Sequence, residues 1–194
     1  IVVATGFDEY RPADGELGFG LDGVVTLADF KAMVDASGPG RLAWQGRPVR
    51  SVAYVYCVGS RGTAGCSNQY CSRFCCASTV QTAVQVSGLD PSVRQFHLYR
   101  DMRTYGKFEP LYTEARDRGS VFLKFDNEEP PVVASAPGGG LTVTVRDLLT
   151  ERTELAIPVD LVVLVTGMVP RENQELVSVL KLPKGSDGFF NEIH

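Results

Sequence analysis

The 194-residue sequence predicts an α/β protein with a Rossmann-like, mostly parallel sheet, helices on both faces and an additional antiparallel meander. Short apolar runs alternate with segments of helical periodicity, which is typical of parallel strands joined by crossover helices. Two further runs, 132–136 and 141–145, are bounded by turns rich in proline and glycine and therefore predict adjacent antiparallel strands. The last apolar run, 161–166, has the character of a strand buried on both faces.

The individual elements follow from local patterns. Runs rich in β-branched and aromatic residues predict strands at 1–6, 49–56, 95–99, 121–125, 132–136, 141–145 and 161–166. Apolar residues at helical spacing predict helices that cover 27–37, 74–87 and 108–118. Thr26 is the expected N-cap of the first helix, with Asp29 in place of the usual Glu or Gln, and Gly38 is its expected end.

Charge and hydropathy exclude several classes of protein. With 19 Lys and Arg against 23 Asp and Glu, the net charge is −4, which argues against nucleic acid as a partner. The hydrophobic share of 44% is enough for a folded core. The longest apolar run, near Leu161, is too short to span a bilayer, so we expect no direct membrane insertion. No export leader opens the chain, which predicts a cytoplasmic location, and the start at Ile1 without Met suggests an excised piece of a longer protein.

Five cysteines are the most informative feature. All of them fall within a window of 20 residues, at positions Cys57, Cys66, Cys71, Cys75 and Cys76. A secreted domain stapled by disulfides would spread its cysteines to close long loops, and an odd number would leave one thiol over. Clustered thiols of this kind indicate metal ligands.

An iron–sulfur cluster suits the spacing best. Three of the thiols lie at the start of one expected helix and Cys57 at the end of the neighbouring strand, so four thiolates could hold a [4Fe–4S] cluster. Arg61 and Arg73 would add positive charge, while Gly59 and Gly62 would let the backbone donate N–H···S bonds. Zinc and plain buried thiols stay open as alternatives, although structural zinc usually takes paired C-x₂₋₄-C knuckles.

Dinucleotide binding is a further alternative at the same turn. The segment 57–62 resembles a glycine-rich phosphate loop, but the chain contains no G-x-G-x-x-G fingerprint. A pyridine-nucleotide-binding domain is therefore less favoured, and a tight turn explains each glycine alone. No Ser–His–Asp set shares one strand edge, so hydrolytic chemistry lacks support.

Several segments together resemble the heterodisulfide reductase A family, which includes the related A and B subunits of quinone-interacting membrane-bound oxidoreductases. The resemblance is carried by IVVATGF at 1–7, YCVGSR at 56–61, YCSRFCC at 70–76, DMRTYG at 101–106 and GFFNEIH at 188–194. It covers essentially the whole chain and is strongest around the cysteines.

The resemblance implies a particular architecture. Members are similar to thioredoxin reductase, with an FAD domain interrupted by a second dinucleotide-like domain. On this basis, residues 1–40 would be a flank of the FAD domain with a connecting helix, 41–170 the inserted cluster-binding domain, and 171–194 the return flank. The turn at 37–40 is the expected boundary.

The resemblance also implies site residues and partners. The ligands of a [4Fe–4S] cluster would be Cys57, Cys71, Cys75 and Cys76, and the cluster would relay electrons between FAD and the other subunits of the complex. At most, FAD would touch the residues Ala4, Thr5, Gly6, Thr166 and Gly167. The segment 58–70 is about one residue longer than the family pattern, so Cys66 could replace Cys71 as a ligand.

For a few other residues, a structural explanation is favoured over a role as a ligand. His97 is expected to be a packed histidine, not a ligand, and His194 to be frayed at the terminus. Arg100, Asp101, Arg103 and Tyr105 follow a strand at the ligand edge and could contact flavin or a partner, but a solvated loop is the favoured interpretation.

Overall fold

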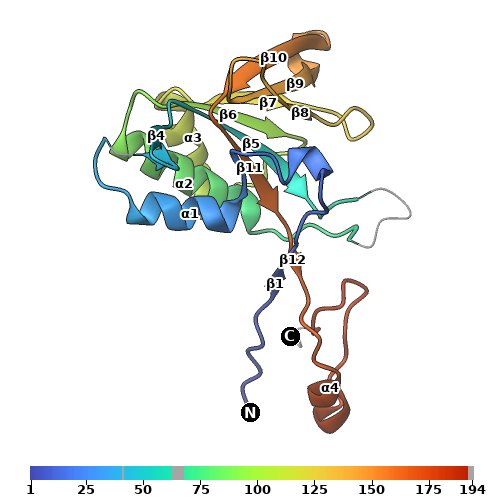
Figure 1. Ribbon diagram of the computed structural model, residues 1–194. Coiled ribbons are helices and arrows are strands. Elements are labelled where there is room, and N and C mark those ends of the chain that lie inside the picture. The colour runs from blue at the N-terminus through green and yellow to red at the C-terminus, as the bar shows by residue number, and fades with distance from the viewer. Residues whose placement is uncertain (41, 63–67, 192–194) are drawn as a thin grey trace.

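A five-stranded parallel sheet forms the centre of the computed structural model, which describes residues 1–40, 42–62 and 68–191 (Figure 1). Its strands are, in spatial order, β2 (Val24–Thr26), β11 (Leu161–Thr166), β5 (Ser51–Val58), β6 (Arg94–Tyr99) and β7 (Val121–Lys124). Each neighbouring pair runs parallel. The expected α/β fold class is confirmed.

Three helices pack on one face of this sheet. They are α1 (Leu27–Ala36), α2 (Cys75–Leu89) and α3 (Glu109–Asp117), and Figure 1 shows them below the sheet. The core between helices and sheet includes Phe30 of α1, whose ring meets the Tyr54 ring of β5 edge to face at 5.7 Å. Both side chains are fully buried.

The opposite face is covered by an antiparallel sheet, where helices were also expected. This sheet has the order β10 (Thr153–Val159), β9 (Leu141–Asp147) and β8 (Val132–Ser135). Alternate residues of β9 are buried against strands β5 and β11, so the meander buries the second face that a helix would otherwise cover. The sequence did not predict β10, because Pro158 and the charged start of this strand weaken its strand signal.

The other strands and helices agree closely with the sequence. The strands expected at 49–56, 95–99, 121–125 and 161–166 are present, with ends shifted by at most two residues. Thr26 caps α1 as expected: the Asp29 N–H donates to Thr26 Oγ1 at 3.3 Å, and the Thr26 hydroxyl donates to Asp29 Oδ2 at 2.9 Å.

The expected strand at 1–6 is wrong. Residues 1–7 have no regular structure, and Ile1 and Val2 are fully exposed. An apolar run forms a strand only where another backbone pairs with it. The described chain supplies a partner only further on, where β1 (Asp8–Glu9) pairs antiparallel with β12 (Met168–Val169).

Short elements complete the fold. A two-stranded ribbon joins β3 (Ala43–Trp44) and β4 (Arg47–Pro48), and α4 (Gln174–Leu180) follows β12. Three 3₁₀ helices lie at Glu16–Gly18, Gly106–Phe108 and Leu148–Thr150. None of the helices within the described ranges has the length and apolar character needed to cross a bilayer.

His97 lies in the core of the sheet, as a packed histidine should. Its ring stacks between Tyr54, at 4.6 Å, and Phe122, at 4.4 Å between ring centroids. Its Nδ1 lies 2.9 Å from the Tyr56 hydroxyl, whereas Nε2 has no hydrogen-bond partner. Full burial lowers the pKa of His97 from 6.5 to about 3, so the ring is neutral in the folded protein.

This burial predicts a pH-dependent stability. Between pH 6.5 and 3 the unfolded chain takes up a proton at His97 that the folded protein does not, so the free energy of unfolding falls as the pH falls. The slope has an upper limit of about 1.4 kcal/mol per pH unit for one proton. We expect the His97→Phe variant to lose stability less steeply with acid than the parent protein, measured by urea unfolding from pH 7 to pH 5. Parallel slopes in the two proteins would contradict this assignment.

Candidate metal centre

Four cysteines gather at the carboxyl edge of the parallel sheet. Cys57 lies at the end of β5, Cys71 in the following loop, and Cys75 with Cys76 in the first turn of α2. A strand and the helix that follows it meet at this edge in every parallel βαβ unit, which brings the thiols to one side of the fold. All four are free thiols; Cys75 and Cys76 are buried, and the other two are half-buried. Cys66 lies outside the described residues, as does His194.

The backbone around the thiols is held in an uncommon conformation. Cys57, Arg61 and Arg73 all have left-handed φ angles, of 64°, 55° and 59°, which cost energy for residues other than glycine. Two hydrogen bonds close the base of the loop: the Arg61 N–H donates to the Tyr70 carbonyl at 2.9 Å, and the Gly62 N–H to the Asn68 carbonyl at 3.0 Å. The loop is thus fixed at both of its described ends.

The adjacent thiols Cys75 and Cys76 differ in acidity. Their mutual hydrogen bond, burial and the charges of the three neighbouring thiolates raise the pKa of Cys75. The same hydrogen bond lowers the pKa of Cys76 to about 7, aided by the Arg103 backbone N–H and by the charges of Arg61 and Arg103, although burial acts in the opposite direction. Negative charge on the neighbouring sulfurs disfavours a second thiolate beside Cys76, and a cation at this edge would relieve that repulsion.

The donor set fits a thiolate-bound metal in type and place. Within the described part of the chain, no three His, Cys, Asp or Glu side chains already lie close enough together to hold a metal ion. Four thiols on one edge are nevertheless the donors that iron–sulfur clusters and structural zinc take. Ligation would have to draw the sulfurs closer than they lie here.

The hydrogen bonds that Gly59 and Gly62 were expected to donate to sulfur are not found in the part of the chain that the structure describes. The Gly62 N–H is used by the Asn68 carbonyl, and no hydrogen bond from Gly59 to a sulfur is present among the described residues. The backbone does offer one N–H to a thiol, from Arg73 to Cys71 Sγ at 3.4 Å. Gly59 instead makes room for a ring: a Cβ there would overlap the Tyr10 side chain.

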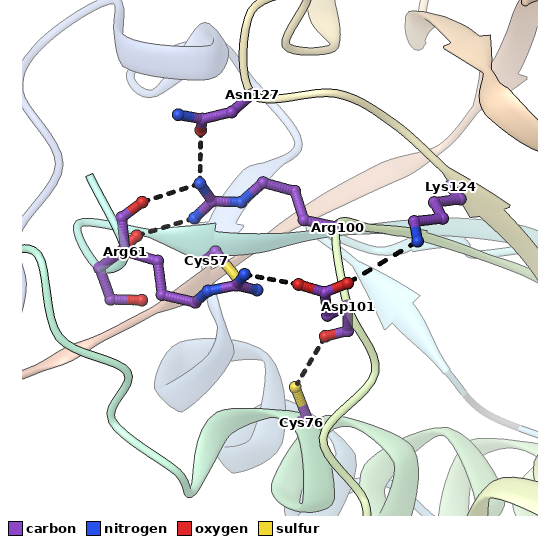
Figure 2. A network of polar contacts seen from close by, with 8 residues as sticks. Cys57, Arg61, Cys76, Arg100, Asp101, Lys124 and Asn127 are labelled. Atoms are coloured by element: carbon purple, nitrogen blue, oxygen red, sulfur yellow. Dashed lines mark hydrogen bonds and ion pairs between the residues drawn. The ribbon is translucent and has the colours of Figure 1, made fainter. Parts of the chain in front are cut away.

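The loop after β6 is exposed at Asp101, as expected, but its first two residues also make specific contacts with the cysteine loop. Arg100 donates to the carbonyl oxygens of Ser60 at 2.9 Å and Arg61 at 2.8 Å, and Asp101 accepts a hydrogen bond from the Arg61 guanidinium at 2.5 Å (Figure 2). The sequence feature that could have revealed these contacts is the position of Arg100 and Asp101 directly after β6, the strand that pairs with β5.

The residues expected to touch FAD are only partly brought together. Ala4, Thr5 and Gly6 line a cavity of about 1150 Å³ together with Cys71 and the return segment near Phe189. Thr166 and Gly167 do not line it. The Thr166 hydroxyl donates to the Glu9 carboxylate, and a Cβ on Gly167 would crowd Ser60 and Ser72.

The fold is similar to part of a solved structure. A copper(II) complex of RclA, an HOCl-induced flavoprotein disulfide reductase from Escherichia coli, superposes with a TM-score of 0.51 at 13% identity, over 97% of this chain and 34% of RclA. No family model matches the sequence.

Curated relatives identify the family more closely. The chain is 34% identical over its whole length to the A subunit of the H(2)/formate:CoB-CoM heterodisulfide,ferredoxin reductase of Methanococcus maripaludis. It is 35% identical to the iron-sulfur A subunit of the CoB–CoM heterodisulfide reductase of Methanocaldococcus jannaschii. The chain belongs to the heterodisulfide reductase A family, and it spans about 30% of the length of these relatives.

The packing of Tyr10 over Gly59 predicts a position-specific loss of stability. Gly59→Ala should lower the free energy of unfolding by about 2–4 kcal/mol, because alanine is strained at a φ of 66° and its Cβ displaces the Tyr10 ring. Gly106→Ala is the matched control: its φ is 63°, but a Cβ there meets nothing within 4 Å. Urea unfolding should show a clearly larger loss for Gly59→Ala; equal losses would contradict the contact.

Proposed function

We propose that this chain is an electron-transfer domain of a flavin- and iron–sulfur-dependent oxidoreductase of the heterodisulfide reductase A type. A [4Fe–4S] cluster held by Cys57, Cys71, Cys75 and Cys76 relays electrons between FAD and partner subunits. The observation that carries the proposal is the meeting of these four thiols at one sheet edge. It is supported by a relative whose name describes an iron-sulfur subunit.

In this proposal the chain performs no bond chemistry itself. A bound [4Fe–4S] cluster would accept and give up one electron at a time. The burial of Cys75 and Cys76 keeps water from part of the site, and Arg61 and Arg103 place positive charge beside the thiolates. Free N–H groups in the first turn of α2 would favour the negative charge of a thiolate-bound centre.

The flavin contacts and the domain division belong to the same proposal. Ala4, Thr5 and Gly6, with Thr166 and Gly167, would touch FAD where the two flanks, 1–40 and 171–194, meet the cluster domain at 41–170. Ala4 to Gly6 are supported by their place in the cavity that Cys71 also lines. The pairing of β2 with β11 favours a first boundary nearer to Val24 than to residue 40.

The proposed partners are other subunits of a heterodisulfide-reductase-like or quinone-interacting complex. The relatives are named as A subunits of reductases, which supports a multi-subunit assembly. Free thiols suit a reducing compartment, so the proposal includes a cytoplasmic location.

Metal analysis tests the proposal directly. The protein purified without oxygen should be brown, and replacing Cys57, Cys71, Cys75 and Cys76 together by Ser should remove about four iron and four sulfide per chain. The sheet should stay folded, because Ser is close in size to Cys and most core residues are unchanged; Cys75 and Cys76 do belong to the core beside α2, so circular dichroism checks the fold.

Cys66→Ser is the matched control and should keep its full iron content. Loss of the iron from this variant alone would overturn the ligand assignment. Colourless protein with stoichiometric zinc would favour a structural or docking domain, and saturable NADH binding would favour a pyridine-nucleotide domain; either result contradicts the electron relay.

A further inference from the structure

The end of β6 is tied to the cysteine loop by two consecutive residues. Arg100 anchors the loop backbone through the carbonyl oxygens of Ser60 and Arg61, and its guanidinium also donates to Asn127. Asp101 binds the Arg61 side chain. As Figure 2 shows, the two side chains diverge, Arg100 toward the loop backbone and Asp101 toward the Arg61 guanidinium.

The charged guanidinium of Arg61 contacts a thiol directly. Its Nη1 donates to Cys57 Sγ at 3.9 Å while Nη2 donates to Asp101 Oδ2 at 2.5 Å, so one guanidinium joins sulfur and carboxylate. The Arg61 side chain is only 20% exposed, which limits the water that could screen it. Arg61 is thus held at its backbone by Arg100 and at its guanidinium by Asp101.

Asp101 also reaches the second cysteine element. Its carbonyl oxygen accepts from Cys76 Sγ at 4.0 Å, and its carboxylate lies 3.7 Å from Lys124 Nζ on the side away from the thiols. The Asp101 carboxylate is thus ion-paired with both the Arg61 guanidinium and the Lys124 ammonium group. Asp101 therefore contacts Cys76 through its backbone carbonyl, and its carboxylate is linked to Cys57 through the Arg61 guanidinium.

We infer that the Asp101 carboxylate offsets the charge that Arg61 places beside Cys57, so that the Arg61–Asp101 pair sets the reduction potential of the centre at the four thiols. This inference rests on the proposed function. Reduction adds one negative charge to such a centre, which a nearby cation favours and a nearby carboxylate opposes. Arg61 places the positive charge next to Cys57 Sγ, and Asp101 places the negative charge on the same guanidinium.

The experiment is a redox titration of the anaerobically purified protein, followed by the spectrum of the cluster, with iron content measured in parallel. Asp101→Asn should shift the midpoint potential to more positive values, because it removes the carboxylate charge. Arg61→Gln should shift it to more negative values. The double variant should return close to the parent protein, because its net charge is unchanged.

Lys124→Gln is the matched control. It removes a charge that also pairs with Asp101 but touches no thiol, so its shift should be smaller than that of Arg61→Gln. All four variants should retain the iron of the parent protein.

Two results overturn the inference. An unmoved potential in Asp101→Asn with full iron would show that the pair does not tune the centre, and loss of iron from Asp101→Asn would show that the pair is structural. Iron-free parent protein contradicts the proposed function instead, so the two failures are distinguishable.

Discussion

The whole site depends on the parallel register of β5 between β11 and β6. This register places the end of β5 beside the end of β6, and the chain then returns through α2 on the same edge. Cys57, Asp101 and the first turn of α2 therefore meet without any long-range loop to bring them together. Antiparallel pairing of β5 with β6 would have placed Asp101 at the opposite end of the sheet.

Charge around the thiols is built in layers outward from this edge. Arg61 lies against sulfur, Asp101 against Arg61, and Lys124 against Asp101. The Arg61 side chain is 20% exposed and the Asp101 side chain 50% exposed. The Lys124 side chain, beyond Asp101, is 37% exposed. The alternating signs keep the net charge of the group small, which allows several ionised groups to share a partly buried edge.

Much of this arrangement could be predicted from the sequence. The apolar runs at 49–56 and 161–166 have enough length and β-branched content to define buried strands, and the clustered cysteines mark the ligand edge. The strand β10 could not be predicted, because alternating burial on a partner sheet is a tertiary effect that its polar residues conceal. The Arg61–Asp101 pair was missed for a similar reason: it joins residues 40 apart, and only the sheet register brings them into contact.

The antiparallel pairing of β1 with β12 has a topological consequence. Tyr10 and Gly167 are hydrogen-bonded at 2.9 Å, and Arg171 binds Asp8, so the chain enters and leaves the sheet at neighbouring points. A unit whose two ends are adjacent can sit within a loop of a host protein without rerouting the host's own strands. The same pairing holds β1 and β12 beside the segment that carries Cys71, since Tyr70 and Ser72 both hydrogen-bond to Met168 of β12.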